Sequence, residues 1–427
     1  MIPQLALHGG TPVIGGPLES FKSMGPEEEA AAVRVVRSGV LSAYIGAPGD
    51  GFMGGTEVRA FERKAAEKFG VRHAIGVNSW TSGLIAGVGA IGVEPGDEII
   101  TTPWTMSATA MAILHWNAIP VFADIDRRTF NIDPESVRKC VTPRTRAILA
   151  ADIFGQSADM DGLRAIADEY GLKLLTDTAQ APGSRRKDGY TGTKADIGGF
   201  SLNYHKHIHC GEGGILVTDD DKLAERLCLI RNHAESVVQS SLPDDLVNMI
   251  GYNFRMGELE AAIASEQLDK LDVRVADRQR VADELNEGLA GLQGLTLPYV
   301  PPYTDHVYYV YGMTLDTTTL GVSRDTIGAA LRAEGVPGVS TAYQNIHRLP
   351  IFTQQIAYGK QGFPWTLRTG ERNFAYGSGT CPVAEELQDI SYLGLAICMN
   401  QLPSEDVTMI VQAFHKVWAN LGQLRSQ

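Results

Sequence analysis

The strongest constraint on the fold is a regular alternation of helical and strand-like segments between Thr56 and about Lys270. Short apolar runs typical of buried strands occur at 73–77, 98–101, 120–123, 145–150, 173–176, 197–202 and 214–218. Stretches typical of helices separate them, at 56–69, 81–91, 107–117, 160–170 and 223–231. This alternation predicts an α/β fold with a mostly parallel central sheet flanked by helices.

The rest of the chain predicts two smaller parts beside this sheet. Outside it, we expect elements at 26–38 (helix), 256–290 (long helix), 307–315 (strand), 324–334 (helix) and 405–420 (helix). We therefore expect an N-terminal segment over 1–55 and a large domain over 56–290. A smaller C-terminal α+β domain is expected over 291–427.

Composition bears on partners and on the cellular compartment. The 427 residues carry a formal charge of −13, which disfavours a general attraction to nucleic acid or to an acidic membrane surface. No stretch is long and apolar enough to span a bilayer, and the first residues lack the features of a signal peptide. The five cysteines are scattered without a Cys-x-x-Cys pair, so we expect reduced thiols and a cytoplasmic location.

Two candidate catalytic residues, Lys206 and Asp177, come just after predicted strands. Ligands of such sheets bind at the carboxyl ends of the strands. A lysine and a carboxylate there are the two groups that a pyridoxal 5'-phosphate (PLP) enzyme needs. The lysine amine forms a Schiff base with the cofactor aldehyde, and the carboxylate keeps the pyridine nitrogen protonated. The alternatives are a surface role for Lys206 and helix capping for Asp177.

Further side chains are candidates for holding the cofactor. Thr81 and Ser82 begin a helix directly after a strand, where free N–H groups and the helix dipole favour a phosphate, with simple capping as the alternative. Trp104 follows a strand end and could stack on the pyridine ring or belong to the core. Gln180 could hydrogen-bond the ring oxygen of the cofactor or be a surface amide.

A cluster of metal-binding residue types surrounds the candidate lysine. If the segment is extended, His205, His207 and His209 lie on one face, and Cys210 follows them. No second ligand cluster with the spacing of a zinc site occurs elsewhere in the sequence. We therefore expect no metal.

These motifs and several others resemble the DegT/StrS group of sugar aminotransferases, PLP-dependent enzymes of fold type I, the fold of aspartate aminotransferase. The resemblance extends over nearly the whole chain. The motifs that carry it are Val77-Asn-Ser-Trp-Thr-Ser82, Glu94-Pro-Gly-Asp-Glu-Ile-Ile100, Pro120-Val-Phe-Ala-Asp-Ile-Asp126, Asp177-Thr-Ala-Gln-Ala-Pro-Gly183, Gly211-Glu-Gly-Gly214 and Gly251-Tyr-Asn-Phe-Arg255.

The resemblance implies further site residues and an assembly. Ser201 would be another ligand of the cofactor phosphate, and His347 would lie near the substrate. Asn253 would reach the cofactor phosphate of a partner subunit, which implies a homodimer with shared active sites.

The resemblance also implies a reaction. An amino acid donor, glutamate or glutamine, would give its amino group to a keto-sugar, most commonly a nucleotide-linked one. A similarity around Leu5-Ala-Leu-His-Gly-Gly-Thr-Pro12 leaves two alternatives, a cyclitol (keto-inositol type) aminotransferase and an aminohydroxybenzoate synthase-like enzyme. A PLP-dependent sugar dehydratase is a further alternative. Because those dehydratases carry His at the lysine position, Lys206 disfavours it. A regulator without turnover is disfavoured by the intact Lys206 and Asp177 pair.

The chain departs from the family pattern at several positions. Trp80 stands where the family commonly has the glycine of Ser-Gly-Thr, so the phosphate loop could be shaped differently. Met106 stands where an aromatic residue is common, which leaves open whether Trp104 or Met106 covers the cofactor ring. Thr176 and Thr178 replace the usual acidic and small neighbours of the aspartate.

Overall fold

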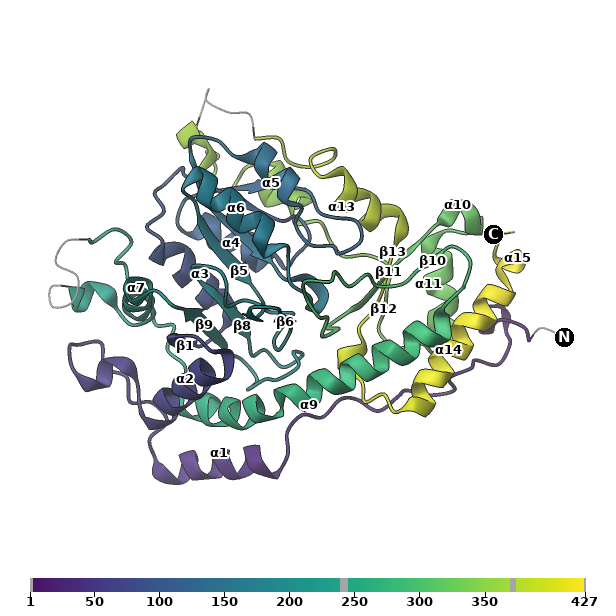
Figure 1. Cartoon of the computed structure of the whole chain (residues 1–427), viewed down its shortest axis with the longest axis horizontal. Helices are drawn as coiled ribbons and strands as arrows, with labels where there is room; N and C mark the ends of the chain where they lie inside the picture. The colour runs from purple at the N-terminus through teal and green to yellow at the C-terminus, as the bar shows by residue number, and fades with distance from the viewer. Residues whose placement is uncertain (1–2, 239–244, 369–373, 426–427) are drawn as a thin grey trace.

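The alternating segments build one central sheet, shown in the computed structural model of Figure 1. The structure describes residues 3–238, 245–368 and 374–425. Hydrogen bonds join the strands in the order β3-β2-β4-β5-β8-β9-β1. Their bounds are β1 (His73–Val77), β2 (Glu98–Thr101), β3 (Ile119–Phe122), β4 (Thr145–Ala151), β5 (Lys173–Asp177), β8 (Gly198–Ser201) and β9 (Gly214–Thr218).

The predicted mostly parallel sheet is confirmed, with one strand reversed. The pairs β2–β3, β2–β4 and β4–β5 are parallel, and the bridge between Leu175 and Ile197 joins β5 to β8 in the same sense. Strand β9 is antiparallel to both β8 and β1. No crossover helix separates β8 from β9, and a direct turn reverses the chain direction. This turn carries Lys206.

Helices cover both faces of the sheet. Successive strand residues point to opposite faces, so Ile148 packs with Leu163 of one helix, whereas Leu149 packs with Leu84 of another. The helices of this part are α2 (Thr56–Phe69), α3 (Trp80–Ala90), α4 (Ser107–His115), α5 (Pro134–Cys140), α6 (Met160–Tyr170) and α7 (Asp221–Arg231).

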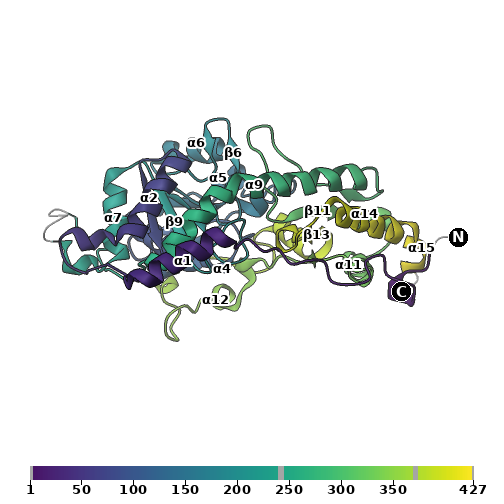
Figure 2. The same ribbon diagram turned by 90° about the horizontal axis from the view of Figure 1, so that it is seen from below.

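A long helix, α9 (Glu258–Leu289), runs beneath the molecule from the central sheet to the C-terminal part (Figures 1 and 2). Its 32 residues span about 48 Å. Leu268 in its first half is buried with residues of β8 and β9, and Leu285 in its second half with residues of β11. Helix α1 (Pro26–Ser38) lies against α9. The boundaries after residues 55 and 290 stay a prediction.

A second, antiparallel sheet forms the core of the C-terminal part. Its strand order is β10-β11-β13-β12, and α11 and α14 pack on it. Leu5 and Ile14 from the N-terminal segment complete this core. The bounds are β10 (Leu295–Thr296), β11 (Tyr311–Leu315), β12 (Val339–Ser340), β13 (Tyr392–Leu395), α10 (Thr317–Leu320), α11 (Arg324–Ala333), α12 (Pro350–Thr353), α13 (Pro382–Glu386), α14 (Ser404–Ala419) and α15 (Leu421–Leu424).

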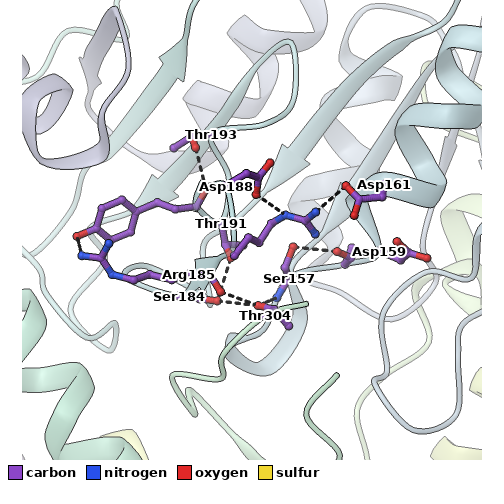
Figure 3. Close-up of polar contacts among 12 residues, drawn as sticks. Ser157, Asp159, Asp161, Ser184, Arg185, Asp188, Thr191, Thr193 and Thr304 are labelled. Carbon is purple, nitrogen blue, oxygen red and sulfur yellow. Dashed lines mark hydrogen bonds and ion pairs between the residues drawn. The ribbon is translucent and has the colours of Figure 1, made fainter. Parts of the chain in front are cut away.

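Residues 301–310 are here called the connecting segment. The strand expected at 307–315 is shorter in the structure, because residues 307–310 belong to this segment. The strand begins only at Tyr311, because the preceding N–H groups bond to the large sheet's loops: Val307 N–H donates to Gly155 O at 2.8 Å. On its other side the segment contacts the hairpin of β6 (Arg185–Arg186) and β7 (Gly189–Tyr190). There Thr304 Oγ1 lies 3.4 Å from Ser184 Oγ (Figure 3). These contacts fix the position of Tyr309.

Along the described part of the chain, no helix combines the length and the apolar character needed to cross a membrane.

Candidate active site

A cavity of about 480 Å³ opens where β5 and β8 end and where helix α3 begins. It is lined by residues from both sheets and from the connecting segment. Those used below are Ser79, Trp80, Thr81, Met106, Asp152, Asp177, Gln180, Ser201, His205, Lys206, Glu212, Tyr309 and Tyr343. Lys206 and Asp177, predicted from their places after strands, therefore share one cavity.

Lys206 lies in the turn between β8 and β9, and only 9% of its surface is exposed. Burial lowers the pKa of Lys206 to about 8 from the ordinary 10.5, while the charge of Asp177 acts in the opposite direction. The Nζ atom lies 4.3 Å from the ring centre of Tyr309, a cation–π distance. An amine with this pKa can act as a nucleophile and as a proton carrier near neutral pH.

Asp177 ends β5, and its carboxylate is held by donors on both oxygens. Oδ1 accepts from the indole Nε1 of Trp80 at 2.6 Å and from Ala179 N at 3.2 Å. Oδ2 accepts from Thr109 Oγ1 at 2.7 Å. The residues after Asp177 form a turn, so it does not cap a helix, although Asp favours such positions.

The start of α3 brings small hydroxyl side chains to one end of the cavity. Ser79 caps the helix, and its Oγ accepts from Ser82 N at 3.1 Å. Thr81 is exposed and lines the cavity together with Ser79, whereas Ser82 is buried behind them. Ser201 at the end of β8 faces the same space. Phosphate binding by Thr81, Ser82 and Ser201 stays a prediction, and Ser79 joins the candidates.

Gln180 lies on the cavity wall, and both the oxygen and the nitrogen of its side-chain amide are hydrogen-bonded. Its Oε1 accepts from Phe154 N at 2.9 Å, and its Nε2 donates to Tyr343 Oη at 3.0 Å. Sequence reasoning missed Tyr343 and Tyr309, because both come from the C-terminal half and follow no strand end or motif.

Trp104 is fully buried and lies outside the cavity lining. Its ring stacks on Tyr343, with centroids 5.4 Å apart, and belongs to an aromatic cluster with Phe130 and Phe154. Met106, in contrast, is 64% exposed and lines the cavity. Stacking of Trp104 on the cofactor stays a prediction, with Met106 the residue at the cavity wall.

Residues around Lys206 form a turn, so the three histidines do not share a face as an extended segment would require. His207 Nε2 lies 2.7 Å from Val307 O, and His209 Nε2 lies 2.7 Å from Ser23 Oγ. His205 lines the cavity, and its pKa is lowered to about 4, mainly by burial and to a lesser extent by the charge of Lys206. Among residues 3–238, 245–368 and 374–425, no group of three or more His, Cys, Asp or Glu could hold a metal.

Asn253 and His347 lie outside the cavity lining of their own chain. Asn253 is exposed, and its Oδ1 accepts from Arg255 Nε at 2.8 Å. His347 is fully buried, and its Nε2 lies 3.0 Å from Glu385 Oε1. The predicted contact of Asn253 with a partner's cofactor and the place of His347 near the substrate both stay predictions.

Asp152 is a cavity residue that sequence reasoning missed. Its carboxylate is almost completely buried, and burial raises its pKa to about 7. Oδ2 accepts from Thr178 Oγ1 at 2.6 Å, and Oδ1 from Ala158 N at 2.9 Å. Thr178, one of the departures from the family pattern, thus supplies a hydrogen bond to this second carboxylate.

Comparison with known proteins places the chain in a family. Residues 46–390 match the model of the DegT/DnrJ/EryC1/StrS aminotransferase family. The spore coat polysaccharide biosynthesis protein SpsC of Bacillus subtilis (strain 168) is 34% identical over 362 residues, covering 83% of this chain and 90% of SpsC. A putative L-glutamine:3-amino-2,3-dideoxy-scyllo-inosose aminotransferase of Streptomyces kanamyceticus is 32% identical and covers 99% of both chains.

Solved structures agree with this placement. The structure of DesI in the presence of its TDP-sugar product superposes with a TM-score of 0.79 at 27% identity, covering 99% of this chain and 97% of DesI. The fold is that of PLP-dependent aminotransferases. The chain belongs to the DegT/DnrJ/EryC1/StrS aminotransferase family, whose aminotransferases depend on PLP.

The pKa of Lys206 predicts the pH dependence of its expected reaction with PLP in the cofactor-free chain. Only the neutral amine attacks an aldehyde, so below about pH 8 most Lys206 amines are protonated and unreactive. The capture rate should rise as the pH passes about 8 and then level off. An ordinary lysine would gain reactivity up to about pH 10.5. Stopped-flow absorbance at a series of pH values measures the rate.

Asp177→Asn provides the internal check on this titration. The negative charge of Asp177 favours the protonated amine, so its removal should move the midpoint of the capture rate to lower pH. A wild-type rate that keeps rising beyond pH 10 would contradict the lowered pKa of Lys206.

Proposed function

We propose that this aminotransferase moves an amino group from glutamate or glutamine to a keto-sugar, with PLP held between Lys206 and Asp177. The buried pair in one cavity is the observation that carries the proposal. When bound, PLP supplies an aldehyde carbon for the amino group and a ring that absorbs the electrons of a substrate carbanion.

The roles of the chain's residues follow from their chemistry. Lys206 would tie the cofactor at rest and, once displaced by the donor amine, carry the donor's α-proton. Its lowered pKa suits both tasks, and the ring of Tyr309 lies against the amine when it carries a proton. Asp177 would hold the proton on the pyridine nitrogen, and the hydroxyls of Thr81 and Ser201 would bind the phosphate together with the N-terminus of α3.

A keto-cyclitol is the second candidate acceptor. The relative from Streptomyces kanamyceticus, named for an inosose substrate, matches this chain over 99% of both lengths. The acidic side chains along the described cavity wall outnumber the one amine, which also suits a neutral or cationic ring better than a diphosphate. Asp177 and Glu212 line the cavity with Lys206, and Asp152 adds a carboxyl group whose pKa of about 7 leaves it partly protonated. An aminohydroxybenzoate synthase-like activity is the remaining alternative among enzymes that act on carbocycles.

The experiment loads the enzyme with amino groups and then offers acceptors. Purified holoenzyme is incubated with glutamate or glutamine, the amino-loaded form is isolated, and nucleotide-linked keto-sugars and keto-inositols are added separately. We expect one class to restore the starting absorbance with stoichiometric amine in the product. Lys206→Ala is the inactive control. Release of a keto product without amine transfer would establish a dehydratase instead.

We further propose a homodimer in which Asn253 serves the partner's site. A two-fold interface makes such a contact twice, and binding then depends on association, so cofactor affinity should fall on dilution. Asn253→Ala should weaken cofactor binding without unfolding the chain.

All five cysteines are free thiols, which supports the proposal of a cytoplasmic enzyme.

Mixing Lys206→Ala chains with Asn253→Ala chains tests the shared site. In a mixed dimer both lesions fall in one site and the other site is native, so activity at limiting PLP should partly return. Activity is compared with each variant alone, after mixed dimers are separated by two different affinity tags. If isolated mixed dimers show no recovery, Asn253 belongs to its own chain's site.

A further inference from the structure

Trp80 makes a direct contact with the candidate cofactor partner. Its indole Nε1 donates to Asp177 Oδ1 at 2.6 Å, within the range of a charge-assisted hydrogen bond. Thr109 donates to the other oxygen at 2.7 Å, and its hydroxyl lies 3.1 Å from Thr105 Oγ1. With a donor on each oxygen, the carboxylate plane cannot rotate freely.

The indole ring of Trp80 is held in place by close packing. It is 6% exposed and lies over two glycines, one in its own helix and one in β8. A Cβ at Gly83 would lie 2.7 Å from Trp80 Cε3, and one at Gly199 would lie 2.3 Å from Cη2. A Cβ at Gly199 would also lie 2.2 Å from Ile215 O, so this glycine is required by the sheet as well. The packing holds the N–H aimed at Asp177.

We propose that Trp80 is a positioning residue that, with Thr109, orients the carboxylate of Asp177 toward the pyridine nitrogen of the cofactor. A carboxylate has about four acceptor sites, so Asp177 can accept from Trp80, Ala179 N, Thr109 and a pyridinium N–H together. The torsion that orients a carboxylate is soft. Because Trp80 and Thr109 fix the carboxylate before the cofactor arrives, cofactor binding does not carry the free-energy cost of ordering that carboxylate.

This inference rests on the proposed function and makes a selective prediction for binding. Trp80→Phe keeps an aromatic ring packed against Gly83 and Gly199 but removes the N–H donor. The loss should weaken PLP binding by roughly tenfold, the scale of one hydrogen bond to a charged group. An analogue with CH in place of the ring nitrogen cannot use Asp177, so its affinity should change little.

Dissociation constants of both ligands are measured by fluorescence titration in a Lys206→Ala background, where binding is noncovalent. Asp177→Asn should show the same selectivity as Trp80→Phe. Thr109→Val provides a second test should Trp80→Phe fold poorly, and Thr109→Ser should retain most of the affinity. Trp116→Phe is the matched control. Trp116 is also a buried tryptophan whose Nε1 donates one hydrogen bond, to Ile85 O at 2.7 Å, but the residue lies outside the cavity lining.

The outcomes separate the inference from the proposed function. Selective loss of PLP affinity in Trp80→Phe or Thr109→Val supports the positioning role. Equal loss of both ligands would assign these residues a purely structural role, and unchanged affinity for PLP in both variants would also overturn the inference. If PLP does not bind even with Trp80 and Thr109 intact, the proposed function fails and the inference fails with it.

Discussion

Lys206→Ala is expected to abolish transamination while PLP still binds noncovalently. Lys206 is the one cavity-lining amine among the described residues, so no neighbour can replace it. The loss of a positioned proton carrier costs roughly two to four orders of magnitude. Loss of the nucleophile that ties the cofactor adds to this. Stopped-flow absorbance of the donor half-reaction measures the rate.

The wild-type enzyme is expected to be yellow, and borohydride treatment identifies its attachment lysine independently. The reduced cofactor should remain attached to the peptide that contains Lys206. Lys222→Ala, which alters an exposed lysine of α7, is the control and should retain full activity and the same labelled peptide. An adduct on any other lysine would show that Lys206 is not the attachment site.

Asp177→Asn is expected to slow the donor half-reaction by roughly two or more orders of magnitude, the scale of one preorganised electrostatic contact. The fold should survive, because the asparagine oxygen can still accept from Trp80 Nε1 while the Thr109 hydroxyl turns to accept from the amide. Without the negative charge the pyridine nitrogen loses its proton, and the ring absorbs carbanion electrons poorly.

Single-turnover rates with saturating PLP separate this effect from weaker cofactor binding. Asp152→Asn is a matched control, because it makes the same substitution at a second buried carboxyl group of the cavity and leaves the expected pyridine partner unchanged. Its rate should fall far less. A near-native rate in Asp177→Asn would show that this carboxylate has only a structural role.

Most of the fold was predictable from local pattern. The helices at 26–38, 56–69 and 160–170 and the strands at 73–77 and 214–218 have the predicted bounds, because each is a continuous apolar or amphipathic run between clear breaks. The reversed direction of β9 was not predictable, since the same apolar run fits either direction. The expected strand at 307–315 starts late because the connecting segment bonds to distant loops.

The sequence by itself determined the family, the fold class and the placement of Lys206 and Asp177 at the ends of strands, because these depend on contiguous motifs and on strand ends. Only the tertiary structure decided which further side chains meet them. Trp80 and Asp177 are 97 residues apart, and Tyr309 and Tyr343 reach the cavity from beyond α9. Such contacts depend on strand order and on the path of the connecting segment, which no local pattern specifies. The same holds for Met106, which lies at the cavity wall, whereas Trp104 is buried outside the cavity lining.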